Sequence, residues 1–153
     1  MKSRLEYSEV APDAHDAIMG LERYVRDCGL EHSLLELVKI RASQMNGCGY
    51  CLDMHTKNAR AAGETEQRIH VLSTWREAPF YTPRERAALE WTEIVTDIGR
   101  HGVAEDVYQR TREHFAEKEL VDLTMAVVTI NGWNRLAVSF GSKVGSYRPD
   151  LAR

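Results

Sequence analysis

The spacing of apolar residues is the feature of this chain that most constrains its fold. Along nearly the whole sequence, apolar side chains recur at steps of three and four residues, which is the period of one face of an α-helix. Strands would require alternating apolar residues or β-branched runs, and the sequence contains neither. Only 10 glycines and 4 prolines interrupt the 153 residues. The sequence therefore predicts an all-α fold.

We expect these helices to form a bundle of about six or seven. Two local patterns indicate helix starts: Thr82 and Pro83 followed by Glu85, and Ser33 followed by Glu36, each typical of a capping box. The last expected helix is apolar on most sides, which indicates burial in the core or in a subunit interface. The expected ranges are 13–27, 33–45, 48–62, 65–78, 83–98, 104–115 and 118–140.

Composition and length limit the possible classes of protein. With 43% hydrophobic and 28% charged residues, residues 1–153 have the composition of a single globular domain. The net charge is only -3 and no block of lysine and arginine stands out, which argues against nucleic-acid binding. No run approaches the roughly 18 apolar residues of a membrane span, and the start lacks the apolar core of a signal peptide. We therefore expect a cytoplasmic protein without membrane association.

Cys48 and Cys51 are the residues most indicative of chemistry. In a reducing compartment, a cysteine pair is more often catalytic or metal-binding than a structural crosslink. Two intervening residues at the start of a helix allow the sulfurs to form and break a disulfide, and the unpaired N–H groups there favour a thiolate. His55 follows Cys51 by four residues, so it lies one helical turn later on the same face. Its imidazole can take the cysteine proton and return a proton to a leaving group.

Glu36 precedes this pair on the neighbouring expected helix. Because the turn at Asn46 and Gly47 is short, the two helices should lie side by side, and the carboxylate can orient His55 or relay its proton. A competing interpretation makes Glu36 the capping-box partner of Ser33. One carboxylate cannot easily serve both purposes.

Other interpretations of the cysteines remain open at this point. Cys48, Cys51, His55 and Glu36 could together ligate a metal, although structural zinc sites usually contain more thiolates. The cysteines could also be inert. Cys28, on the apolar stripe of the first expected helix, is best explained by packing. Redox chemistry remains the favoured hypothesis, with no resident metal or cofactor.

The four residues together match a known motif. Glu36, Cys48, Cys51 and His55 fit the pattern Glu-x11-Cys-x2-Cys-x3-His, and the chain resembles the AhpD-like alkylhydroperoxidase domain of the carboxymuconolactone decarboxylase superfamily. Residues 39–48 and 131–135 are also similar to the peroxidase-related branch. The resemblance extends roughly over residues 14–140.

The resemblance implies an all-helical domain that assembles into homo-oligomers, often trimers or hexamers. It implies that Cys51 reduces a small-molecule hydroperoxide and becomes a sulfenic acid, which Cys48 resolves as a disulfide. His55 and Glu36 would form the proton relay. An external dithiol would then reduce the disulfide; in the best-known members a lipoyl-carrying protein supplies the electrons. Those members have a second histidine where this chain has Tyr50, an auxiliary residue whose phenol is a poor base at neutral pH.

Two further functions compete with the peroxidase hypothesis. The superfamily also contains decarboxylases of γ-carboxymuconolactone-type acids, but these do not need a Cys-x-x-Cys pair. A non-enzymatic redox sensor, whose disulfide changes the packing of an oligomer, is the second alternative.

Overall fold

The computed structural model describes residues 3–149, apart from the side chain of His101. Over that range the chain contains no strand, which confirms the predicted all-α class. None of the helices described is both long and apolar enough to cross a membrane. The helices are α1 (Tyr7–Val10), α2 (Pro12–Asp27), α3 (His32–Asn46), α4 (Gly49–Ala61), α5 (Glu66–His70), the 3-10 helix η1 (Leu72–Thr74), α6 (Pro83–Thr96), α7 (Ile98–His101), α8 (Glu105–Arg112) and α9 (Glu117–Phe140).

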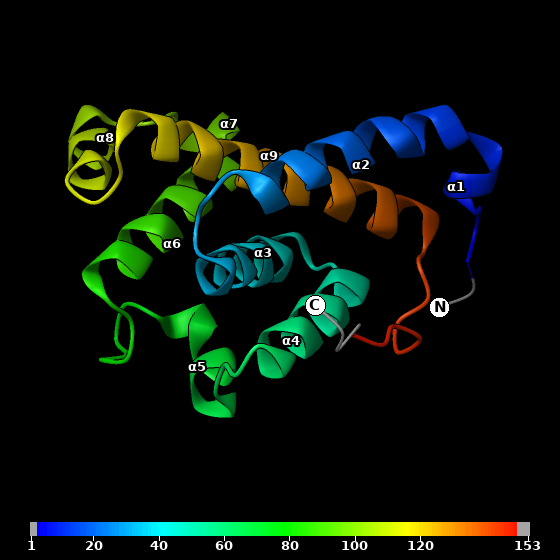
Figure 1. The fold of residues 1–153 in the computed structure, drawn as a ribbon, viewed down its shortest axis with the longest axis horizontal. Coiled ribbons are helices and arrows are strands. Elements are labelled where there is room, and N and C mark those ends of the chain that lie inside the picture. Colours follow the sequence, from blue (N-terminus) through cyan, green and yellow to red (C-terminus); the bar gives the residue numbers. More distant parts are fainter. Residues whose placement is uncertain (1–2, 150–153) are drawn as a thin grey trace.

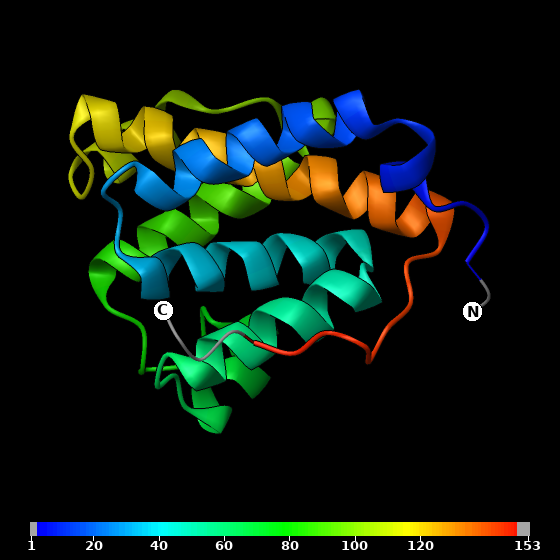
Figure 2. The ribbon, with the colours of Figure 1, turned by 45° about the vertical axis from the view of Figure 1, so that its right-hand side comes forward.

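Helix α3 is the centre of the fold. Figure 1 and Figure 2 show α2 and α9 running side by side, with α3 next to them and α4 on the opposite side of α3. Helix α3 packs against α4, α6 and α9. As a result, residues 34–40 are buried without interruption, and two of them, Glu36 and Lys39, are charged. Charged side chains in the central helix must face an internal polar site, because they do not face solvent.

The prediction of a single helix over 65–78 is wrong. Helix α5 ends at His70, and the chain turns and continues as the short 3-10 helix η1. The Tyr81 hydroxyl donates a hydrogen bond to the carbonyl of Arg68. In a continuing helix that carbonyl would accept from the N–H of Leu72. The turn places Leu72 and Trp75 in the core, so tertiary packing overrides the local helical pattern.

The two predicted capping boxes had different outcomes. At the start of α6, Thr82 and Glu85 form the reciprocal hydrogen bonds, which confirms that box. At the start of α3 the prediction is wrong: the helix begins at His32, and the N-cap residue Glu31 makes no side-chain cap. Glu36 is therefore not engaged in capping its own helix.

The two ends of the described chain pack against different helices, the N-terminal end against the end of α9 and the C-terminal end along α4. The N–H of Arg4 donates to the carbonyl of Phe140 at 2.9 Å. After α9, residues 141–149 run along α4 (Figure 2). Lys57 Nζ donates to the Tyr147 carbonyl at 3.1 Å, and the Tyr147 hydroxyl donates to Asn58 Oδ1 at 2.8 Å. This terminal segment adds a wall to the region in which the cysteines lie.

Candidate functional site

A tight turn between α3 and α4 places the cysteines. Gly47 ends α3 in the left-handed conformation, with φ at 65°, which glycine adopts without steric strain. The N–H of Cys48 then donates to the carbonyl of Ser43 at 3.0 Å, so the chain reverses within two residues. Cys48 becomes the N-cap residue of α4, so the helix begins at Gly49, one position after the start that the sequence predicted.

Two asparagines of α9 hold this turn in place. Asn46 Nδ2 donates to Asn131 Oδ1 and to Asn134 Oδ1, each at 2.9 Å. Asn134 Nδ2 in turn donates to Ser43 Oγ at 3.0 Å, and both Ser43 and Asn134 are buried. The segment 131–135, which resembles the peroxidase-related branch, therefore supports the turn that carries the cysteines.

Cys48 and Cys51 form a disulfide, and their Cα atoms are 5.4 Å apart, well within the normal range. Both residues are buried. The N–H of Cys51 lies 3.3 Å from Cys48 Sγ and donates to it. Cys48 thus lies at the positive end of the α4 dipole, where a thiolate is favoured.

His55 and Glu36 form a buried pair between α4 and α3. His55 Nδ1 lies 2.9 Å from Glu36 Oε2, and both side chains are almost fully enclosed. When Glu36 is ionised, this contact places the ring proton on Nδ1 and leaves Nε2 as the basic nitrogen. Of the two interpretations of Glu36, the structure therefore favours contact with His55.

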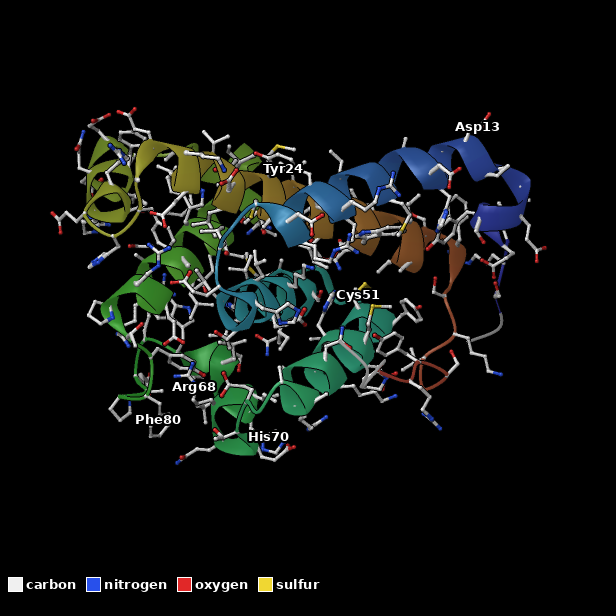
Figure 3. The ribbon with its side chains drawn as sticks, in the orientation of Figure 1. Asp13, Tyr24, Cys51, Arg68, His70 and Phe80 are labelled. Carbon is white, nitrogen blue, oxygen red and sulfur yellow. A yellow bond between two sulfur atoms is a disulfide. The ribbon has the colours of Figure 1, made fainter. Side chains whose placement is uncertain are left out.

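A cavity of about 420 Å³ opens over this region. Figure 3 shows Cys51 near the start of α4, on the side that faces α2 and α9. Cys51 and His55 both line the cavity, whereas Cys48 does not. The remaining wall is mixed, with apolar, aromatic and charged side chains: Tyr7, His15, Met19, Glu22, Arg26, His32, Leu35, Glu36, Lys39, Tyr50, Met54, Asn58, Trp133, Ala137 and Tyr147.

Tyr50, the residue expected to be auxiliary, also lines the cavity. Burial raises the pKa of its phenol, and the nearby Tyr147, Glu6 and Asp53 raise it further. The hydroxyl is therefore protonated at neutral pH, so it can donate a hydrogen bond but cannot act as a base.

Three further residues of this cavity, which the sequence analysis did not assign to the site, form what we call the Lys39 cluster: Glu22, Lys39 and Trp133. Lys39 Nζ lies 2.6 Å from Glu22 Oε1, and Trp133 Nε1 donates to Glu22 Oε2 at 3.2 Å. A signal was available for Lys39, which follows Glu36 by three residues and so shares its helix face. Glu22 and Trp133 come from α2 and α9, and nothing local links them to α3.

The electrostatics of the Lys39 cluster keep Glu22 ionised. Burial raises the pKa of Glu22, but the charge and hydrogen bond of Lys39 outweigh it and hold the pKa below its ordinary value. His55 and the hydrogen bond from Trp133 lower it further. Trp133 also packs against the small apolar cluster that contains both cysteines. The Lys39 cluster therefore adjoins the residues predicted to carry the chemistry.

Comparison with known proteins places these residues within a family. A sequence model described as the Carboxymuconolactone decarboxylase family matches residues 12–93, more than half of the chain, including both cysteines. The uncharacterized protein YdfG of Bacillus subtilis is 44% identical over 146 residues, 95% of this chain and 99% of YdfG. Alkyl hydroperoxide reductase AhpD of Bradyrhizobium diazoefficiens is 32% identical over 71 residues, 46% of this chain and 36% of AhpD.

A solved structure has the same architecture. The crystal structure of ATU0492 from Agrobacterium tumefaciens superposes with a TM-score of 0.92 at 45% sequence identity, covering 95% of this chain and 100% of that one. ATU0492 is described as a protein of unknown function and suggested to be an AhpD antioxidant defence protein.

Proposed function

The chain belongs to the carboxymuconolactone decarboxylase family and has the AhpD-like fold, and from this premise we propose that it is a thiol-dependent hydroperoxide reductase. Cys51 is the attacking thiol, Cys48 the resolving thiol, and His55 with Glu36 the proton relay. Antioxidant defence is the corresponding physiological role.

The asymmetry of the two cysteines carries this proposal. Cys51 lines the cavity with His55, while Cys48 lies outside the cavity wall at the N-cap of α4. A hydroperoxide that enters the cavity therefore meets Cys51. The pairing of His55 with Glu36 leaves Nε2 of the imidazole as the base for the thiol proton.

The proposed reaction balances with two thiols and one hydroperoxide. His55 takes the proton of Cys51, and the thiolate attacks the terminal oxygen of ROOH. An S–O bond forms, the O–O bond breaks, and the departing alkoxide takes the proton from His55 to give ROH. The thiol of Cys48 then attacks the sulfenic acid of Cys51, forming the S–S bond and releasing water.

Reduction of the disulfide requires an external dithiol. The candidate donors are small dithiols and a lipoyl group on a partner protein. Since Cys51 is the cysteine on the cavity, an incoming thiolate attacks Cys51 and displaces Cys48. Cys48 is a good leaving group because the helix N-terminus and the N–H of Cys51 stabilise its thiolate. The donor completes the exchange with its second thiol.

Intact-mass spectrometry of the reduced protein titrated with cumene hydroperoxide tests the proposal. We expect the loss of two hydrogen atoms as the Cys48–Cys51 disulfide forms, and full recovery with a dithiol. A protein that stays reduced under these conditions would refute the peroxidase assignment. Turnover of a carboxymuconolactone-type acid that survives alkylation of both cysteines would support decarboxylation instead.

A further inference from the structure

The Lys39 cluster has no role in the proton relay described above, yet it lies in the same cavity as Cys51. Lys39 and Glu22 are an ion pair whose Lys39 member is buried, with 7% of its side chain exposed. Removing such charges from water opposes folding, so a buried pair contributes little net stability compared with apolar residues of the same volume. Its presence on the wall of the cavity that Cys51 also lines therefore points to a chemical role.

The geometry also shows how the ammonium group of Lys39 is held. Glu22 accepts one of its three N–H groups at 2.6 Å, and Trp133 anchors the other oxygen of Glu22. Lys39 also lies on the same face of α3 as Glu36, one turn away. A positive charge is thus positioned on the cavity wall, with donors remaining for a bound molecule.

We propose that Lys39 is a further catalytic residue, which stabilises the negative charge that develops on the leaving alkoxide oxygen as the O–O bond of the hydroperoxide breaks. Glu22 and Trp133 are positioning residues that hold the ammonium group. This inference rests on the proposed function. His55 supplies the proton to the leaving oxygen, whereas Lys39 lowers the energy of the charge before the proton arrives.

This role makes the contribution of Lys39 depend on the leaving group. An alkyl hydroperoxide expels a strongly basic alkoxide, on which much charge must be stabilised. Peracetic acid expels acetate, a weak base that needs little stabilisation. Replacement of Lys39 should therefore slow the reaction with the alkyl hydroperoxide far more than the reaction with the peracid.

The test is a single-turnover measurement in the Cys48→Ser background, in which the sulfenic acid of Cys51 accumulates. Rapid quenching and mass spectrometry give its rate of formation with tert-butyl hydroperoxide and with peracetic acid. For Lys39→Met we expect a loss of about 100-fold with the alkyl hydroperoxide and a much smaller loss with the peracid. Lys39→Arg should retain most of the wild-type rate with the alkyl hydroperoxide relative to the peracid. Glu22→Gln should lose part of that relative rate.

Lys118 provides a matched control. Its Nζ pairs with the buried Asp122 at 2.6 Å, and it does not line the cavity. Lys118→Met should change neither the rate with tert-butyl hydroperoxide nor the rate with peracetic acid. Equal losses with both peroxides in Lys39→Met would overturn the inference, and Glu22→Gln applies the same criterion if Lys39→Met does not fold. A wild-type Cys51 that reacts with neither peroxide would instead refute the proposed function.

Discussion

His55 Nδ1 lies 2.9 Å from Glu36 Oε2, across the contact between α4 and α3. This contact joins a residue next to the cysteine pair to a carboxylate 19 positions earlier in the chain. It orients the imidazole and, with Glu36 ionised, leaves Nε2 as the ring nitrogen that can accept a proton. The contact therefore fixes how the imidazole is held in the proposed site.

Replacement of Glu36 by Gln tests this contact. The amide removes the charge that stabilises protonated His55, so the rate of Cys51 oxidation should fall by about 100-fold. The pH dependence of Cys51 alkylation by iodoacetamide should shift as well, which a purely structural defect would not produce. Glu64→Gln, at a carboxylate paired with Arg68, is the control. An unchanged oxidation rate in Glu36→Gln would exclude Glu36 from the relay.

The two cysteines should respond differently to substitution. Cys51→Ser should abolish hydroperoxide consumption, because the attacking sulfur is lost. Cys48→Ser should still react once, and a sulfenic acid should accumulate on Cys51, where dimedone traps it for mass spectrometry. Hydroperoxide consumption by Cys51→Ser at the wild-type rate would show that the roles are assigned wrongly.

The asparagines of α9 should stabilise the turn before Cys48. In Asn134→Ala, Asn46 loses one of its acceptors and the buried Ser43 loses a donor. Urea denaturation of the reduced protein should show a loss of about 1–3 kcal/mol in the free energy of unfolding. Gln67→Ala, at an exposed position of α5, should change stability by no more than about 0.5 kcal/mol. Similar values for the two variants would argue against the support of the turn by Asn134.

Glu93 should make stability depend on acid pH. Burial raises the pKa of Glu93, but hydrogen bonds from Trp75, Arg76 and Arg41 outweigh it and hold the pKa below the ordinary 4.5. A lowered pKa means that the stabilisation is complete above pH 4.5 and is lost as the pH falls through the folded-state pKa. As the pH falls through this range, the urea concentration at the midpoint of unfolding should decrease less in Glu93→Gln than in the wild type. The same dependence of this midpoint on pH in both proteins would contradict this explanation.

Assembly can be tested at α9. Val121 and Val128 are 59% and 46% exposed and lie two turns apart on one helix face. If the expected homo-oligomer uses this face, Val128→Glu should lower the mass measured by analytical ultracentrifugation, whereas Val10→Glu in α1 should not. The same measurement on reduced and oxidised protein addresses the redox-sensor alternative. An assembly that is unchanged by oxidation, together with clear peroxidase turnover, would remove that alternative.

Features that depend on neighbouring residues could be predicted from the sequence alone. The helical period indicated the all-α class, and Thr82 with Glu85 marked the start of α6. The spacing of Cys48 and Cys51 indicated a pair within disulfide reach at the start of a helix. These features follow from local steric and hydrogen-bonding rules, which act over a few residues.

Only the tertiary structure could decide the features in which distant residues compete for the same group. Glu36 could serve Ser33 or His55, and the packing of α4 against α3 selects His55. The helix expected over 65–78 ends at His70, where the Tyr81 hydroxyl donates to the carbonyl of Arg68 and Leu72 and Trp75 pack into the core. The approach of Glu22 and Trp133 to Lys39 likewise depends on how α2 and α9 pack. Such contacts depend on helix positions in space, which no local pattern encodes.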